Sequence, residues 1–230
     1  MNLSGLQKLT LLDFPGRMAC TVFIDGCNFR CPFCHNSGLV IDHTAPALEQ
    51  EAFFSFLKKR AGVLDGVCVT GGEPLLHTDL GPFLERIKSL GYQVKLDTNG
   101  SFPDRLAALA EAGWIDYVAM DIKNSKEQYA RTAGLPELSM DPICRSVEFL
   151  LSGKVDYEFR TTVVREFHSR REFEQIAQWL QGARRYFLQA FVDSPQVIQS
   201  GLHGCAKEKM EEFCGLLRSR GIPAELRGVE

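Results

Sequence analysis

Two patterns of apolar and polar residues alternate along this chain. Short runs rich in β-branched and aromatic residues predict buried strands, and longer segments whose apolar residues recur every three or four positions predict amphipathic helices. Strands are expected at residues 20–24, 67–70, 94–96, 117–120, 157–164 and 186–191, with helical patterns between them.

The helical segments carry start and stop signals. In residues 80–90 the apolar positions keep the three-and-four spacing, Asp79 can cap the first turn, and Gly91 can end the helix in a left-handed conformation. Similar signals recur in later segments, which begin at Asp141-Pro142 or end before Gly153, Gly182 or Gly221.

This alternation defines the expected fold. Six strands alternating with six helices imply a parallel sheet joined by right-handed crossovers, which is an α/β fold. A length of 230 residues is near the lower end for a β/α barrel. We therefore expect an incomplete (β/α)6 TIM-like barrel of parallel strands. No repeat, low-complexity tract or long linker divides the chain, so residues 1–230 should form a single domain.

Composition narrows the class of protein. With 45% hydrophobic residues and a net charge of −3, the chain can bury one large core, and its densest basic clusters are only pairs of arginines. Neither nucleic acid nor a membrane is an expected partner, because there is no basic patch and no run of 18 apolar residues. The N-terminus lacks the features of a signal peptide, so a cytoplasmic protein is expected.

The stretch CNFRCPFCHN places Cys27, Cys31 and Cys34 within eight residues. In a reducing compartment such a cluster indicates a metal site rather than disulfides. Zinc would need His35 as its fourth ligand, which is awkward because His35 adjoins Cys34. A 4Fe–4S cluster normally takes four cysteines, so three leave one iron open, unless Cys68 completes the set and makes the cluster a plain electron carrier.

The cysteines outside this stretch have a simpler interpretation. We interpret them as small buried hydrophobic residues. They are Cys20, Cys68, Cys144, Cys205 and Cys214.

Other unusual residues follow the predicted strands. In a β/α barrel the reactive groups lie on the loops that leave the carboxyl ends of the strands. The cysteines follow the first strand, and later strand ends carry the remaining candidates: Gly71, Gly72, Glu73, Pro74, Asp97, Asp121, Lys123 and Arg160. We expect these side chains to gather at one rim of the barrel.

The spacing CxxxCxxC with an aromatic residue before the last cysteine resembles the signature of radical S-adenosylmethionine (SAM) enzymes. The loop Gly71-Gly72-Glu73-Pro74, about 40 residues further on, resembles the second motif of that superfamily, which receives the SAM amino group. The resemblance implies a single 4Fe–4S cluster on Cys27, Cys31 and Cys34. The open iron would be chelated by the amino and carboxylate groups of SAM.

The glycine-rich loop has expected roles in SAM binding. Gly71 and Gly72 lack a Cβ, so their backbone can approach a ligand closely. Glu73 is expected to accept a hydrogen bond from the SAM ammonium, and its alternative is a solvated carboxylate in a turn.

Further SAM contacts follow from the resemblance. Asp97 would pair with the ammonium, Asp121 would accept from a ribose hydroxyl, and Lys123 would neutralise the SAM carboxylate. The alternative is that both aspartates only start turns. Arg160 is either a further contact or a structural ion pair.

The adenine of SAM has its own candidates. Phe33 could pack against it and Asn36 could hydrogen-bond to it, although Phe33 could equally belong to the core. The resemblance also implies a histidine after the sixth strand that helps to bind SAM in related activating enzymes. The nearest match here, residues 188–191, has no histidine, so either Gln189 takes its place or the contact is absent.

A closer resemblance is to the activating enzymes of glycyl-radical enzymes, over residues 5–191. The stretches DFPG at 13–16 and EFRTTVV at 158–164 look more like activators of anaerobic ribonucleoside-triphosphate reductase than like pyruvate formate-lyase activators, which have DGPG. Residues 37–52 contain no cysteine where some relatives carry a cysteine-rich insert, so one cluster is expected.

The implied chemistry is reductive cleavage of SAM followed by abstraction of the Cα hydrogen of a glycine on a partner protein. A low-potential electron donor such as flavodoxin or ferredoxin would reduce the cluster. Residues 124–140 are a candidate docking surface for the glycyl-radical enzyme, or a cap on the barrel. The rivals are a radical SAM enzyme for a small molecule, similar to carboxy-deazaguanine synthases, and a zinc-binding protein without catalysis.

Overall fold

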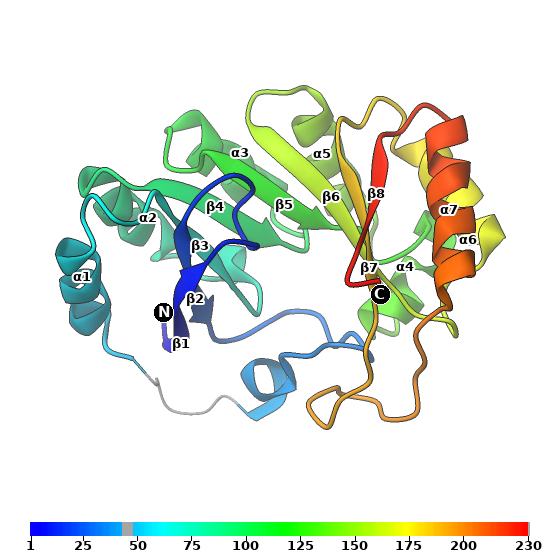
Figure 1. Cartoon of the computed structure of the whole chain (residues 1–230), viewed down its shortest axis with the longest axis horizontal. Coiled ribbons are helices and arrows are strands. Elements are labelled where there is room, and N and C mark those ends of the chain that lie inside the picture. The colour runs from blue at the N-terminus through cyan, green and yellow to red at the C-terminus, as the bar shows by residue number, and fades with distance from the viewer. Residues whose placement is uncertain (43–47, 230) are drawn as a thin grey trace.

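In the part of the chain that the structure describes, eight strands form one sheet whose spatial order follows chain order (Figure 1). This computed structural model describes residues 1–42 and 48–229. The strands are β1 (Leu3–Thr10), β2 (Ala19–Ile24), β3 (Gly66–Gly71), β4 (Gln93–Thr98), β5 (Tyr117–Asp121), β6 (Asp156–Val163), β7 (Tyr186–Ala190) and β8 (Ala224–Arg227). β1 is antiparallel to β2, whereas β2 to β8 are parallel. Because β1 and β8 remain edges, the described sheet is an incomplete barrel.

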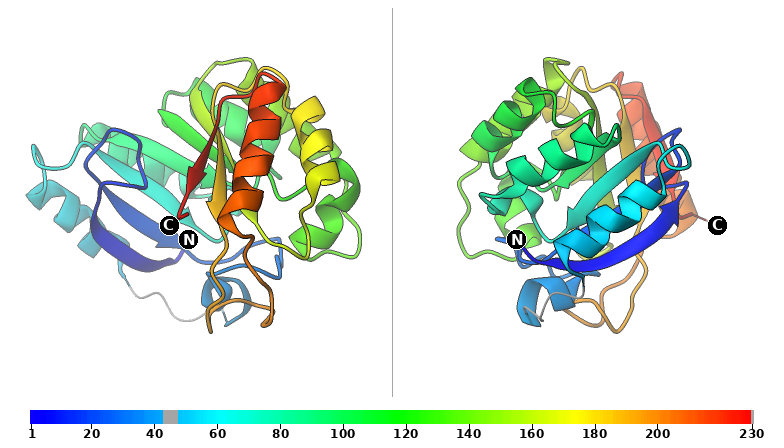
Figure 2. Two further views of the ribbon diagram at one scale, coloured as in Figure 1. Left: turned by 45° about the vertical axis from the view of Figure 1, so that its right-hand side comes forward. Right: turned by 90° about the vertical axis from the view of Figure 1, so that its left-hand side faces the viewer.

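Helices connect the parallel strands and cover the outer face of the curved sheet (Figure 2). The crossover helices are α1 (Gln50–Lys59), α2 (Leu80–Ser89), α3 (Pro103–Glu111), α5 (Asp141–Leu151), α6 (Arg170–Trp179) and α7 (Lys207–Ser219). Shorter helical turns are η1 (Gly38–Asp42), η2 (Pro74–Leu76), η3 (Lys126–Gln128) and α4 (Tyr129–Ala133). No helix within residues 1–42 and 48–229 is long and apolar enough to cross a membrane.

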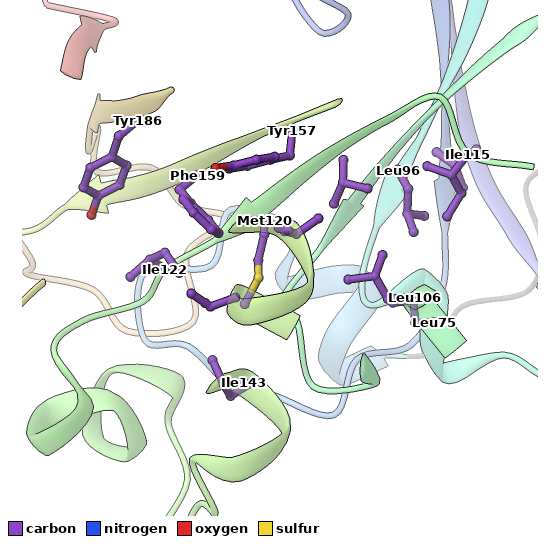
Figure 3. Packing of buried hydrophobic residues seen from close by; sticks show 14 of the residues in the cluster. Leu75, Leu96, Leu106, Ile115, Met120, Ile122, Ile143, Tyr157, Phe159 and Tyr186 are labelled. Atoms are coloured by element: carbon purple, nitrogen blue, oxygen red, sulfur yellow. The ribbon is translucent and has the colours of Figure 1, made fainter. Parts of the chain in front are cut away.

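The outer face of the sheet carries the hydrophobic core. Successive strand residues point to opposite faces, so every second residue of a strand faces the helices. Leu96, Met120 and Phe159 from three neighbouring strands share one buried cluster with Leu106 of α3 and Ile143 of α5 (Figure 3). This apolar layer fixes the strands and therefore the positions of the loops at their ends.

The inner face of the sheet is polar. Lys95 of β4 is 1% exposed, and its ammonium pairs with Asp97 and lies 3.7 Å from the sulfur of Cys68. Glu158 of β6 is fully buried, and its carboxylate accepts hydrogen bonds of 2.8 and 3.0 Å from Arg227 of β8. Branched apolar side chains usually fill a TIM barrel. Here paired charges occupy part of that space.

The predicted fold class and all six predicted strands are confirmed, as β2 to β7. The edge strands β1 and β8 were not predicted. β1 has no clean alternation of buried and exposed residues, and β8 has only four residues, which include Glu225 and Arg227. Of the cysteine-free stretch 37–52, residues 43–47 lie outside the described residues.

Two local predictions need correction. Asp79 precedes α2 but makes no capping hydrogen bond; its carboxylate instead pairs with the N-terminal ammonium of Met1 at 2.7 Å. Cys144 and Cys205 are half-buried rather than buried, unlike Cys20, Cys68 and Cys214. The left-handed glycines after the helices are confirmed, with φ of 87° at Gly91 and 82° at Gly221.

Residues 124–140 pack behind the cysteine loop. Asn124, Tyr129 and Thr132 are fully buried, and the backbone N–H of Arg30 donates to the carbonyl of Ala133 at 2.9 Å. Gly134 has a positive φ, and a Cβ there would collide with the Arg30 carbonyl. The first half of this segment therefore supports the cysteine loop, as the alternative of a cap on the barrel implies. A docking role for its exposed residues stays a prediction.

Candidate functional site

A cavity of about 260 Å³ lies at the carboxyl ends of the parallel strands. Its wall comes from the cysteine loop after β2 and from the ends of β3 to β7. The loop after β7 closes over the cysteine loop, because His35 Nε2 lies 2.7 Å from the Val192 carbonyl and Gln199 N–H donates to the Pro32 carbonyl at 2.8 Å. In Figure 1 these two loops lie together at the end below the strands.

The three clustered thiols line this cavity. Burial raises the pKa of Cys27 to about 12 and that of Cys31 to about 11, and it also raises the pKa of Cys34. The metal-free thiols are therefore neutral near pH 7, and metal binding must release their protons. In the described residues, no three His, Cys, Asp or Glu side chains are placed to hold a single metal ion. All three thiols line the cavity, and a 4Fe–4S cluster would bind each of them through a different iron.

The glycine-rich loop fits closely against the backbone before Cys27. Gly71 has a φ of 119°, and a Cβ on it would collide with Ile24, while a Cβ on Gly72 would collide with the Gly26 carbonyl. The N–H of Gly72 donates to the Ile24 carbonyl and that of Glu73 to the Gly26 carbonyl, both at 2.8 Å. The glycines thus allow this loop to pack beside the cysteine loop, and both line the cavity.

Glu73 lies behind the cavity wall and is fully buried. Its carboxylate accepts hydrogen bonds from Leu75 N–H, the Thr98 hydroxyl and Asn99 N–H at 3.0, 2.9 and 2.6 Å. Burial raises the pKa of Glu73 to about 7, although these three bonds oppose the rise. Pro74 is also buried and begins η2. Glu73 therefore joins the loops after β3 and β4, and its contact with SAM stays a prediction.

A row of side chains with alternating charges extends along the cavity from Lys95 to Lys123. Arg160 Nη1 lies 3.1 Å from Asp97 and Arg160 Nε lies 3.1 Å from Asp121, while Lys123 pairs with Asp121 at 3.0 Å. Lys95 pairs with Asp97 at the inner end. Three cations and two anions leave one net positive charge beside the thiols. For Arg160 the sequence left open a SAM contact or a structural ion pair. Arg160 makes the ion pairs, and it also lines the cavity.

The two aspartates in this row of charges stay ionised because of the neighbouring cations. Burial alone would raise the pKa of Asp121, but Lys123 and Arg160 outweigh it and lower the pKa to about 2. Burial opposes ionisation of Asp97 too, yet Arg160 and Lys95 hold its pKa below the ordinary value. Both carboxylates are therefore ionised acceptors near pH 7.

The adenine candidates also reach the cavity. Phe33 is 5% exposed, and its ring centre lies 6.1 Å from that of Phe167. Asn36 Nδ2 donates to the Gly71 carbonyl at 3.0 Å. Both line the cavity, and so does Gln189 of β7. The structure brings together every predicted site residue except Glu73 and Pro74, which support the wall from behind.

Sequence reasoning missed Thr70, Asn99 and Thr162, which line the cavity. The threonines face the interior two positions after Cys68 and Arg160, so strand alternation could have found them. Asn99 Nδ2 donates to Asn28 Oδ1 at 2.9 Å and lies 4.0 Å from the sulfur of Cys27. Its position in a loop gave no periodic signal.

The sequence profile of the radical SAM superfamily matches residues 21–180, which is more than half of the chain. The chain belongs to the radical SAM superfamily. Its cofactors are accordingly a 4Fe–4S cluster and SAM, and the cavity with three thiols beside a glycine loop suits them. This membership decides against the zinc alternative.

Individual relatives refine the comparison. A Methanocaldococcus jannaschii protein named as a proposed glycyl-radical enzyme activating enzyme is 30% identical over 194 residues, which are 82% of this chain and 79% of that protein. A 7-carboxy-7-deazaguanine synthase of Koribacter versatilis is 30% identical over 63% of this chain and 61% of its own. The crystal structure of Streptococcus suis SuiB bound to SAM is 13% identical and superposes with a TM-score of 0.70, over 90% of this chain and 52% of SuiB. This last likeness concerns the fold.

Proposed function

We propose that this radical SAM enzyme activates a glycyl-radical enzyme, and that its partner is an anaerobic ribonucleoside-triphosphate reductase. The observation that carries the proposal is the match to the Methanocaldococcus protein, which covers about four fifths of both chains. The deazaguanine synthase, at the same identity, matches a smaller share of each chain.

In this proposal Cys27, Cys31 and Cys34 hold the cluster and leave one iron for SAM. When reduced, the cluster supplies the electron that splits SAM into methionine and a 5′-deoxyadenosyl radical, which takes the Cα hydrogen of the target glycine. None of the residues of this chain has to act as an acid or a base. These residues bind and orient SAM and exclude water from the cavity.

The cavity residues have matching roles for the parts of SAM. Lys123 pairs with the carboxylate, Asp97 accepts from the ammonium, and Asp121 accepts from a ribose hydroxyl, because both aspartates are ionised and lie on the wall. The backbone of Gly71 and Gly72 lies open to the same cavity. Each contact exchanges part of an existing ion pair for one with SAM.

The choice of reductase rests on residues 158–164 more than on the DFPG stretch. Phe14 of DFPG lies in the β1–β2 loop, where its ring centre is 6.0 Å from that of Tyr117 at the amino end of β5. That end is opposite the cysteine cavity, so DFPG supports barrel construction rather than partner recognition. Arg160 and Thr162 of β6, in contrast, line the cavity.

The test mixes anaerobically reconstituted protein, reductant and SAM with the reductase and, separately, with a formate-lyase-type enzyme. We expect the EPR doublet of a glycyl radical in the reductase mixture. A reductase whose candidate glycine is replaced by alanine is the matched control and should give no doublet. A doublet only with the formate-lyase-type enzyme would overturn the choice of partner.

A second candidate function is a radical SAM reaction on a small molecule, favoured by the match to the deazaguanine synthase. Under this candidate, methionine would be released without a doublet in either mixture. The release should then depend on an added small substrate.

A further inference from the structure

Two aromatic rings with a cation at each end lie in a line from the cysteine cavity to the protein surface. Lys123 Nζ lies 6.0 Å from the ring centre of Phe33, the ring centres of Phe33 and Phe167 are 6.1 Å apart, and Arg131 Cζ lies 5.3 Å from the ring centre of Phe167. These distances are typical of cation–π and aromatic contacts. Lys123 and Phe33 line the cavity, whereas Arg131 is exposed on α4.

Arginines gather at the outer end of this line. Arg131, Arg165 and Phe167 line one shallow depression of about 190 Å³. Arg30 of the cysteine loop adjoins α4, because its N–H donates to the carbonyl of Ala133. All three arginines are exposed. Within the described part of the chain, neither Arg30 nor Arg131 has a carboxylate within 4.0 Å.

Two carboxylates share the depression, and both are engaged locally. Glu166 accepts from the N–H and Nδ1 of His203 at 3.0 and 2.8 Å and lies 3.5 Å from Arg165. Glu172 accepts from the N–H of Ser169 at 2.9 Å, at the start of α6. Arg30 Nη1 donates to the carbonyls of Cys27 and Phe29 at 2.6 and 2.8 Å, and these neutral acceptors do not cancel its charge. Arg165 shares Glu166 with His203. In the described residues, the charges of Arg30 and Arg131 are therefore not compensated by a nearby carboxylate.

The charge of this surface contrasts with that of the whole protein. The chain carries a net charge of −3, which repels an acidic protein at long range. An acidic protein that docks must therefore meet a local positive surface. Reduction of the cluster also requires a donor close to the cysteines, because electron transfer slows steeply with distance. The arginines beside the cysteine loop meet both requirements.

We propose that the arginine patch, defined as Arg30, Arg131 and Arg165, docks an acidic one-electron donor protein of the flavodoxin or ferredoxin type. The donor passes one electron to the cluster for each SAM cleaved and is itself oxidised by one electron. This proposal rests on the proposed function, since it assigns the cluster to the cysteine cavity. It adds the surface by which that cluster is reduced.

The test compares two reductants in the full-length reconstituted protein, with methionine release from SAM as the readout. Reduced flavodoxin must dock, whereas dithionite is small and need not. Arg131→Glu should lower the flavodoxin-driven rate about tenfold, within the range of about 10- to 1000-fold by which local charge changes association rates, and leave the dithionite-driven rate unchanged. Arg165→Gln should act in the same direction with a smaller effect.

The matched control is Arg220→Glu, which makes the same change of net charge. Arg220 is exposed at the end of α7, near the amino end of β8 and so away from the cysteine cavity. Both rates of this variant should equal those of the wild type. In 1 M salt, where the Debye length is about 3 Å, the difference between Arg131→Glu and wild type should disappear.

Three outcomes would overturn the proposal. An unchanged flavodoxin-driven rate in Arg131→Glu would show that the patch does not dock the donor. An equal loss with dithionite would give Arg131 a structural role. With dithionite as reductant, Arg131→Glu could release methionine normally and yet form less glycyl radical. That result would mean that the patch docks the glycyl-radical enzyme and not the electron donor. Methionine release needs no glycyl-radical enzyme, so failure of the activase assignment would be seen separately in the EPR experiment.

Discussion

The two ends of the barrel differ in a way that cavity size does not reveal. The larger cavity, about 600 Å³, lies at the amino ends of the strands and is lined by Phe14, Tyr117 and Glu158, among others. The smaller cavity, about 260 Å³, lies at the carboxyl ends and holds the three clustered cysteines. Volume alone would select the wrong end.

The difference lies in how the polar groups are held. At the amino end, the buried carboxylate of Glu158 is satisfied by Arg227 and by the Tyr117 hydroxyl at 3.0 Å. Phe14 packs there against Gly66, where a Cβ would lie 2.9 Å from the Phe14 ring. At the carboxyl end, thiols and ionised carboxylates face a shared space on loops that the strands position. The amino end therefore stabilises the barrel, and the carboxyl end carries its chemistry.

Removal of the thiols tests the chemical role of the carboxyl end most directly. Cys27→Ala, Cys31→Ala and Cys34→Ala should each abolish the SAM-responsive EPR signal of the reduced cluster. Cys68→Ala should keep it, because Cys68 lies inside the barrel beside Lys95 and does not line the cavity. Loss of the cluster in a folded Cys68→Ala protein would show that the cluster has no open iron.

A change at the amino end should affect stability and not SAM. Phe14→Ala removes a ring that is 4% exposed, and such a deletion costs about 3–5 kcal/mol of unfolding free energy. Chemical denaturation of the apo-protein measures this loss. The SAM affinity of the reconstituted variant should match the wild type, and a large fall would mean that the two ends are coupled.

Changes to the row of charged residues at the carboxyl end should lower SAM affinity. Lys123→Met and Asp97→Asn should each lower SAM affinity about 10- to 100-fold, because a hydrogen bond to a charged group contributes about 1.5–3 kcal/mol. Equilibrium binding to the reconstituted protein measures this. Glu158→Gln is the control at the amino end and should leave SAM affinity unaltered. Unchanged affinity in both cavity variants would make these residues purely structural.

A substitution of Glu73 distinguishes a structural role from direct contact with SAM. Glu73→Gln directs an amide NH2 at one of the donors that now point at the carboxylate, which should cost about 1–3 kcal/mol of unfolding free energy. For a chain of this length the Tm should fall by about 2–4 °C for each kcal/mol. A stable variant with weakened SAM binding would instead place Glu73 in direct contact with SAM.

The pH dependence of the same residue has a definite sign. The pKa of Glu73 is raised from an ordinary value of 4.5 to about 7. Between these pH values the folded protein binds more protons than the unfolded one, so Glu73 makes stability fall as pH rises through this window. Thermal unfolding of the apo-protein at pH 5.5 and 7.5 measures the effect. The Glu73→Gln protein should lack this contribution.

Periodicity and motif spacing in the sequence were sufficient to predict the central parallel strands and the rim where the candidate site residues lie. Both are local signals: alternation reports which face of a strand is buried, and the end of each strand indicates where its loop begins. The cysteine spacing was likewise readable without the fold. β1 and β8 escaped because edge strands bury one side only and their sequences alternate weakly.

Tertiary contacts were needed to separate the candidate residues that line the cavity from those that support its wall. Glu73 turned out to join two loops because its hydrogen-bond donors, Thr98 and Asn99, lie 25 residues or more away in the chain. Arg160 meets Asp97 and Asp121 only because β4, β5 and β6 are neighbours. Motifs and strand ends in the sequence were enough to predict which residue types reach the rim. Which of them face the cavity depends on distant contacts, and these exist only after the sheet has formed.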